Sequence, residues 1–263
     1  MPIVPAYVRP AALWRRQPEG SSRLDPSHPL ASGMKFLGTP NNGPRDLVVG
    51  TPTWTDLGLI PPVVRRTRGL IWGMQADGES WQYTGNENIT GNIGTFFVAM
   101  HETSGAGLNG HVLWGTNTTT AVPFFMAAGG GVQGWGQDIN GATSTSYFNN
   151  PNFQTIVMSS RDGTAAGVNY WNNGKLNANG AGGVAPSSFA SGAKYFRIGA
   201  WAASAGFNVQ GEMLLIGYTS RAWGESEARA FHDNPWQMFE PQPSRSVYFF
   251  ATATDTLFAQ ACL

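Results

Sequence analysis

The sequence has little charge. Asp, Glu, Lys and Arg make up 12% of its 263 residues, about half of the share that soluble domains usually carry. Residues 71–160 contain no Lys or Arg, whereas residues 1–70 hold nine of these against four Asp and Glu. A nucleic-acid-binding domain needs a basic stripe on its folded face, and this central stretch cannot supply one. We therefore expect no nucleic-acid partner.

Cysteine and long apolar runs are also scarce. Cys262 has no second cysteine to pair with, so no internal disulfide is expected. The chain has no run of about eighteen apolar residues, which argues against membrane insertion through a spanning helix. Residues 1–7 lack the basic and apolar regions of a secretory signal, so none is predicted.

Glycine and aromatic residues are plentiful instead. The chain has 34 Gly, 12% aromatic residues and 41% apolar residues, which suits a sizeable core enclosed by turn-rich β structure. Its length allows one large domain, and no linker divides it. Short apolar runs alternate with turn residues at roughly ten-residue intervals, which is typical of a β-sandwich. The runs before residue 120 are 34–37, 47–49, 70–74, 95–101 and 111–114.

The clearest hairpin lies in the second half of the chain. A strand over 153–160 is followed by Asp162-Gly163, a second strand over 167–171 and then Asn173-Gly174. Asp-Gly and Asn-Gly adopt positive φ at low cost, as two-residue hairpin turns require. We therefore predict an antiparallel meander here.

Helical periodicity occurs once, after an unbroken apolar strand over 211–218. Glu225 and Glu227 would occupy the first turn of this helix, and Ala228 and Phe231 would face inward. The sequence thus predicts one short amphipathic helix packed on a sheet.

The residues that flank this helix predict how it begins and how the chain continues. Gly224 is a weak cap, so packing should stabilise the helix. Asn234 then caps a second short turn with Pro235 at its first position. Trp236 and Phe239 should anchor that turn on the sheet.

The order of these segments resembles the closing half of laminin G-like, concanavalin A-like jelly-roll domains. The resemblance covers roughly residues 30–240 and implies an all-β jelly-roll sandwich with one short C-terminal helix and extended terminal arms. The segments that carry it are the meander, residues 196–199, the strand over 211–218, residues 221–223 and 225–228, and, at the opening, residues 33–36, 45–47 and Trp54.

The chain divides into three parts. Residues 1–32 carry six prolines, too closely spaced for a helix or central strand, so they are expected to form an extended arm. Residues 33–240 would form the jelly-roll domain, and residues 241–263 a tail that packs on a partner or neighbouring subunit. Aromatic side chains in this tail would be aggregation-prone in water, which predicts a role in assembly and a homo-oligomer. These residues are Tyr248, Phe249, Phe250 and Phe258.

Both ends of the chain are similar to those of jelly-roll proteins encoded by tailed bacteriophages and prophages. The similar segments are residues 14–18, 23–25 and 29–30, then 234–239 with Pro241, Pro243 and a hydrophobic strand over 246–251. The resemblance implies a virion structural protein, such as a capsid decoration, head fibre or tail-associated component, that contacts other virion proteins. Such particles assemble in the host cytoplasm and are released by lysis, which fits a protein without an export signal.

The alternative is a glycan-active enzyme or a free carbohydrate-binding lectin on the same scaffold. Laminarinase-type hydrolases of this fold carry two glutamates and an aspartate on one strand, because acid and nucleophile stand about 5 Å apart. No Glu-x-Asp-x-x-Glu occurs here. The nearest pair, Asp77 and Glu79, is separated by Gly78, which favours a turn. We therefore predict no enzymatic activity.

A glycan ligand would need aromatic rings for stacking, and amides or carboxylates for its hydroxyls. A sandwich also uses such rings in its core, and that alternative stays open for each of them. Laminin G-like domains often hold calcium at the rim, and Asp138 or Asp162 could contribute to such a site, but no set of six oxygen ligands is evident. No other cofactor is predicted. The candidate glycan contacts are Trp135, Asp138, Tyr147, Trp171 and Trp201.

Overall fold

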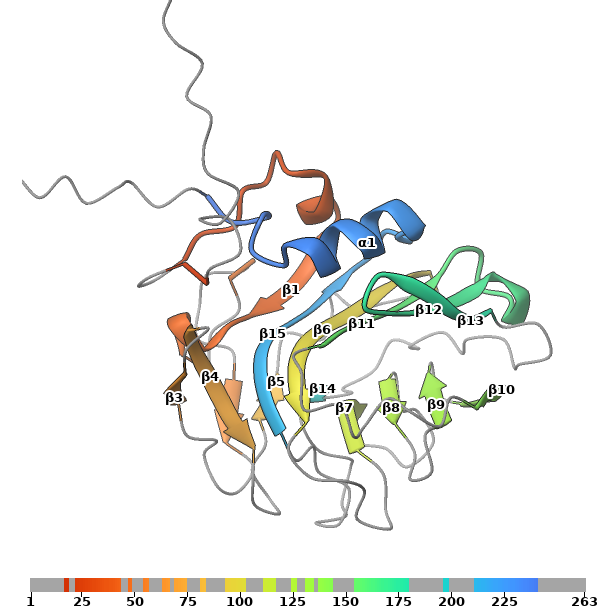
Figure 1. The fold of residues 1–263 in the computed structure, drawn as a ribbon, viewed down its shortest axis with the longest axis horizontal. Coiled ribbons are helices and arrows are strands. Elements are labelled where there is room, and N and C mark those ends of the chain that lie inside the picture. The colour runs from red at the N-terminus through yellow and green to blue at the C-terminus, as the bar shows by residue number, and fades with distance from the viewer. Residues whose placement is uncertain are drawn as a thin grey trace, which may run out of the picture.

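A computed structural model gives the fold (Figure 1). The fold has two sheets, and for the second of them the structure describes the backbone only. The residues described are 17–18, 22–43, 47–48, 54–56, 63–66, 69–74, 81–83, 93–102, 111–116, 124–126, 131–134, 137–143, 154–179, 196–198 and 211–240.

Two antiparallel sheets face each other (Figure 1). The first contains β1 (Met34–Gly38), β3 (Val63–Arg66), β4 (Gly69–Met74), β6 (Gly94–Glu102), β11 (Gln154–Ser160), β12 (Val168–Asn172), β13 (Lys175–Asn179) and β15 (Gly211–Thr219). The second contains β2 (Trp54–Asp56), β5 (Trp81–Tyr83), β7 (His111–Thr116), β8 (Phe124–Met126), β9 (Gly131–Gly134), β10 (Gln137–Thr143) and β14 (Phe196–Ile198).

Each sheet combines strands that are consecutive in the chain with central strands that are distant in it, as in a jelly roll. In the first sheet it is β13-β12-β11-β6-β15-β4-β3, with β1 paired to the C-terminal half of β15. In the second sheet it is β10-β9-β8-β7-β14-β5-β2. The predicted all-β jelly-roll sandwich is confirmed, as is the single short α-helix in the described part of the chain, α1 (Glu225–Asp233).

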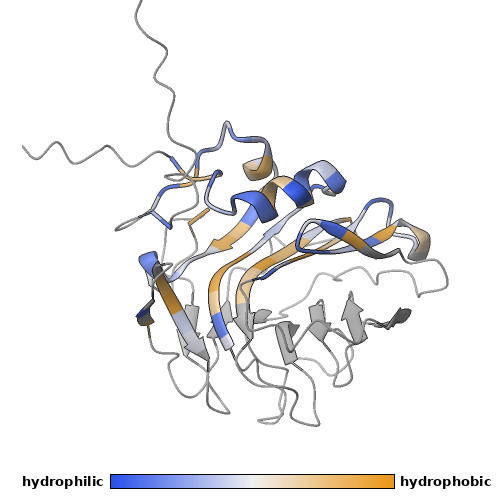
Figure 2. Cartoon of the chain, in the orientation of Figure 1, coloured by the Kyte–Doolittle hydropathy of each residue, from blue (hydrophilic) through white to orange (hydrophobic). Residues whose placement is uncertain are grey.

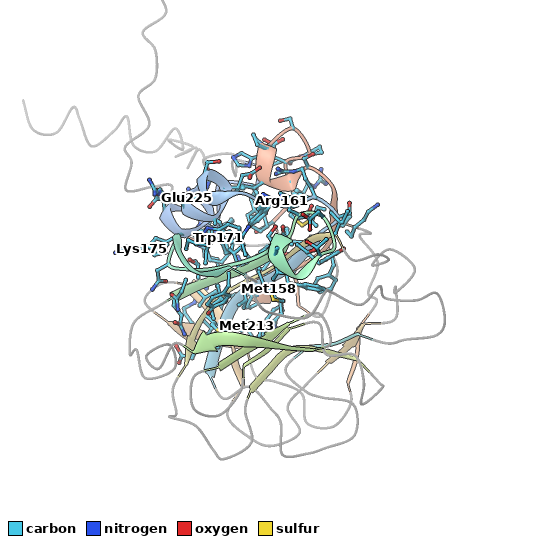
Figure 3. All side chains as sticks on the ribbon, turned by 90° about the vertical axis from the view of Figure 1, so that its right-hand side faces the viewer. Met158, Arg161, Trp171, Lys175, Met213 and Glu225 are labelled. Carbon is cyan, nitrogen blue, oxygen red and sulfur yellow. The ribbon has the colours of Figure 1, made fainter. Side chains whose placement is uncertain are left out.

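The central strands of the first sheet are apolar on both faces because both faces are covered. The second sheet covers one face, and α1 lies over the other (Figure 1). Figure 2 shows the resulting hydrophobic band along these strands. In Figure 3, Met158 and Met213 lie toward the second sheet, whereas Trp171 lies toward α1. This two-sided burial explains why β15 is apolar without a break from Met213 to Tyr218.

The cluster beneath α1, which we call the outer core, centres on Phe97. Its ring stacks on Trp223 at a centroid distance of 4.7 Å and meets Phe231 edge-on at 5.1 Å. Phe97 lies opposite Gly217 in the pairing of β6 with β15. A Cβ at Gly217 would come within 2.2 Å of the Phe97 ring, so this close approach requires glycine.

The sequence-based expectations for α1 and the turn after it are confirmed. Gly224 precedes the helix with no side chain to cap it, and its N–H donates to Glu227 Oε2 at 2.6 Å. After the helix, Asn234 Oδ1 accepts the N–H of Trp236 at 3.2 Å. Trp236 and Phe239 are both buried in the outer core and anchor the turn as expected.

The meander is confirmed, with one correction to its turns. Asn173 and Gly174 have φ of 51° and 72°, and they form the two-residue turn between β12 and β13. Asp162-Gly163 instead belongs to a longer connection over residues 161–167, because Ser160 pairs with Val168. Asp162 bonds to Thr164 there and so stabilises a local turn rather than a tight hairpin.

Of the five apolar runs predicted as strands before residue 120, four form strands and the run over 47–49 does not. They correspond to β1, β4, β6 and β7. Leu47 and Val48 lie in a turn, where the N–H of Leu47 donates to the carbonyl of Leu37 at 2.8 Å. Leu47 thus packs against the core from a turn rather than a strand, while Val48 beside it is exposed.

Substituting Gly217 with Ala should lower the free energy of unfolding by about 1–3 kcal/mol, because the added methyl forces the Phe97 ring out of its stack. Urea unfolding followed by tryptophan fluorescence measures this. Gly224→Ser is the control, since its Cβ has room and Ser caps a helix slightly better than Gly does. An unchanged midpoint for Gly217→Ala would contradict the packing described.

Candidate functional site

The predicted ligand residues do not gather at one described place. Trp135, Tyr147 and Trp201 lie outside the described residues, as does the Asp77–Glu79 pair. Asp138 lies on β10, where it pairs with Gln133 of β9. Trp171 lies on β12 in the other sheet.

Trp171 is part of the outer core. It is 3% exposed and pairs with Val157, so it faces α1 rather than the second sheet. Its ring is therefore not open to a ligand in this structure, and the core alternative describes it better. Alternation along a strand could not reveal this, because both faces of the strand are buried.

Asp162 is exposed, and its carboxylate is engaged locally. Its Oδ1 accepts the N–H of Thr164 at 2.9 Å and the hydroxyl of Thr164 at 2.7 Å. These hydrogen bonds hold the pKa of Asp162 below its usual range. Within the described ranges, no three His, Cys, Asp or Glu side chains come together as a metal site would require. Calcium binding stays a prediction.

One end of the sandwich brings the strand of Asp138 close to the first sheet. Strand β10 lies against β13, so the open edges of the two sheets meet there. On the neighbouring strands, Gln154, Tyr170 and Asn172 share the face that looks toward the second sheet, as their register with Ile156 and Met158 shows. We call this region the sheet-edge site.

Polar side chains are unusual at such inward positions. Gln154 is 1% exposed, and its Nε2 has no hydrogen-bond partner among the described residues. Asn172 is also buried. Tyr170 beside them is 1% exposed, so, like Trp171, these side chains are not open to a ligand in this structure. Sequence analysis missed Gln154 and Asn172; the available signal was a polar residue in an apolar strand.

A second feature is the meeting of the two ends of the described chain, which we call the terminal junction. Leu24 and Phe239 form an isolated antiparallel bridge. The N–H of Asp25 donates to Met238 at 2.8 Å, and the N–H of Glu240 donates to Arg23 at 2.9 Å. The segment that follows residue 240 therefore starts beside residues 23–25, whereas the segment before residue 23 continues along the domain: the N–H of Ser22 donates to Asn42 Oδ1 at 3.0 Å, and Gln17 Oε1 accepts the N–H of Leu70.

Polar contacts fasten the segment before β1 to the start of α1. The guanidinium of Arg221 donates to the carbonyl of Pro29 at 2.8 Å and pairs with Glu227. Nearby, the hydroxyl of Thr219 donates to Ser32 at 2.9 Å. Residues 29–32 of the predicted arm are thus packed on the domain, with Leu30 2% exposed. The boundaries predicted for the three parts of the chain stay predictions.

Two titratable side chains, Tyr218 and His28, form hydrogen bonds to the backbone that stabilise the fold. Burial raises the pKa of Tyr218 to about 12, and its hydroxyl donates to the carbonyl of Ile93 at 3.2 Å. His28 accepts the N–H of Leu30 through Nδ1 at 3.2 Å, and burial lowers its pKa.

No helix in the described part of the chain is long and apolar enough to cross a membrane.

Solved structures that resemble this chain share its sandwich. Domain 4 of AbnA, an extracellular arabinanase from Geobacillus stearothermophilus solved with arabinotriose, aligns with a TM-score of 0.53 at 12% identity over 76% of this chain and 98% of that one. The binding domain of Paraclostridial Mosquitocidal Protein 1 aligns at 0.52 and 11% identity, over 77% of this chain and 52% of that one. That of Botulinum neurotoxin serotype D aligns at 0.50 and 8% identity, over 76% and 50%.

These likenesses show that the chain has the jelly-roll β-sandwich fold of these domains. At such identities they establish the fold alone. The chain spans nearly all of the arabinanase domain but only about half of each toxin domain. No family model and no curated protein matches the sequence.

Proposed function

We propose that this protein is a non-enzymatic structural component of a tailed-phage-type particle, held by its terminal segments and presenting its lectin-like domain outward. The terminal junction carries the proposal. Because residues 23–25 and 238–240 pair with one another, the segment after residue 240 leaves the domain beside the stretch where the N-terminal segment is packed on it. One pole can therefore attach to a neighbouring subunit while the rest of the sandwich stays free.

The attached pole and the second sheet lie on different sides of the molecule. Figure 1 shows the segment before β1 and the turn after α1 above the first sheet, with β7 to β10 on the far side of that sheet. Attachment through the terminal junction would thus turn the second sheet outward. The tail residues Tyr248, Phe249, Phe250 and Phe258 lie outside the described residues, and their role in assembly belongs to this proposal.

The virion location and the ligand-binding role are supported by resemblance in sequence. The similarity of both chain ends to phage jelly-roll proteins supports a virion location, as a capsid decoration, head fibre or tail-associated component. The partners would then be other virion proteins and further copies of this chain. The similarity of the meander and its neighbours to laminin G-like domains supports a ligand-binding role for the sandwich.

A host surface glycan is the ligand that we propose for the outward side. The arabinanase domain of the same fold was solved with a trisaccharide, arabinotriose, which supports this ligand class. We propose binding without cleavage, because the sequence lacks the carboxylate motif of laminarinase-type hydrolases.

Particles released from the producing host should carry this protein through density-gradient purification. A variant lacking residues 246–263 should fold but stay in the free fraction, since the aromatic tail that binds the neighbouring subunit is gone. Mass spectrometry of the particle band measures both, and circular dichroism of the free variant checks its fold. Wild-type protein found free of particles, or the deletion found on them at wild-type levels, would refute the proposal.

Glycan binding should depend on the second sheet. On an array of bacterial surface glycans, Trp135→Ala and Asp138→Asn should each weaken binding about tenfold, the loss expected for one stacking ring or one charge-assisted hydrogen bond. Asp162→Asn is the matched control and should bind normally. No new reducing ends should appear on incubation with the bound polysaccharide; their appearance would favour the enzyme instead.

A further inference from the structure

The first sheet ends in two edge strands, β13 and β3, and they differ in regularity. Within the described part of the chain, neither strand pairs with anything on its far side. Figure 1 shows them at opposite ends of the sandwich. The pairing of β12 with β13 shifts register and leaves Asn177 opposite no residue, and such a bulge protects an edge against further pairing. The ladder between β3 and β4 has no such shift, so the β3 edge can accept another strand.

An apolar row on the inner face of the first sheet ends in a half-exposed side chain at the β3 edge. Met213 pairs with Trp72, and Trp72 pairs with Val63, so their side chains share the face that looks toward the second sheet (Figure 3). Trp72 is fully buried, whereas Val63 is 49% exposed. Arg65, two residues further along the same face, is exposed as well. The β3 edge therefore offers an apolar side chain beside a guanidinium.

The chemistry of this edge decides which strand suits it. Two β3 strands pairing with each other would bring Arg65 and Arg66 of both copies onto one short ladder, where like charges are destabilising. Residues 1–16 carry three prolines, each of which would leave the ladder without a donor. Residues 246–251 contain neither proline nor charge and are rich in aromatic side chains, which favour strands. This part of the tail is the segment that fits the edge best.

The tail begins near the β3–β4 hairpin. The N–H of Glu240 donates to the carbonyl of Arg23 at 2.9 Å, and Gln17 Oε1 accepts the N–H of Leu70 on β4. The six residues from 17 to 23 span at most about 22 Å, which limits the distance between these two contacts. Residues 241–263 reach about 75 Å when extended. The tail is thus long enough to meet the β3 edge of an adjacent copy.

We propose that residues 246–251 of one copy add as an edge strand to β3 of the next copy. Apolar side chains of the tail would then continue the row that ends at Val63, and an aromatic ring would lie within reach of Arg65. Because the tail and the β3 edge are different surfaces, the contact is heterologous and joins copies in a ring or a row. The inference rests on the proposed role of the tail in assembly and names the surface that receives it.

Disulfide trapping in the full chain tests this proposal. In a Cys262→Ser background, Val63→Cys protein is mixed with protein that carries one cysteine at position 247, 248, 249 or 250 and is then mildly oxidised. A covalent dimer with one copy of each should form, because side chains opposite each other in a ladder lie close enough for a disulfide. Its yield should alternate along the tail, since only every second side chain shares the face of Val63. Mass spectrometry of the dimer identifies the bond.

Leu176→Cys is the matched control, because Leu176 is 51% exposed and lies on the bulged β13 edge. With protein at about 10 μM, docking raises the local concentration of the tail cysteine, so trapping at Val63 should exceed trapping at Leu176 at least about tenfold. If Val63→Cys folds poorly, Arg65→Cys on the same face replaces it.

The proposal would be overturned by the absence of a mixed dimer, by equal trapping at Leu176, or by trapping confined to single chains that carry both cysteines. The particle test is separate from this one. Protein that is lost from particles when the tail is deleted, yet is not trapped at β3, would refute this inference and leave the proposed function standing. Protein that is trapped at β3 but is never found on particles would do the reverse.

Discussion

The outer half of the molecule depends on the ring of Phe97 lying across Gly217. With no Cβ on β15 at this point, the ring lies close to the strand and leaves room for Trp223 to stack on it and for Phe231 to meet its edge. These two contacts seat α1 on the sheet. The turn after α1 then reaches Leu24 through Phe239, which forms the terminal junction.

Covering the first sheet on both faces has a functional consequence. Its outer face is covered in large part by α1 and by the segment before β1, with Leu176 of β13 left 51% exposed, and its inner face is covered by the second sheet (Figure 1). What remains is the second sheet and the end of the sandwich where β10 meets β13. Attachment through the terminal junction and recognition by the second sheet can therefore coexist on one domain without competing for the same surface.

The sequence predicted the fold well where local chemistry decides the structure. Asn173-Gly174 formed the expected turn because both residues accept positive φ, and Asn234-Pro235 formed the expected cap. Prediction failed where distant partners decide. The sequence left open whether Trp171 contacts a ligand or lies in the core, because a strand pattern does not say that a helix covers it, and the terminal junction joins residues more than two hundred positions apart. The inward amides Gln154 and Asn172 share one face only through strand pairing.

The central claim is that this domain attaches through the pole where its two ends meet and turns its second sheet outward. Cryo-electron microscopy of intact particles, at a resolution that distinguishes the two sheets, tests it most directly. The account predicts density for the sandwich with the 23–25 and 238–240 ladder against the particle body and β7 to β10 facing solvent. A sandwich bound through the second sheet, with the terminal junction in solvent, would contradict it.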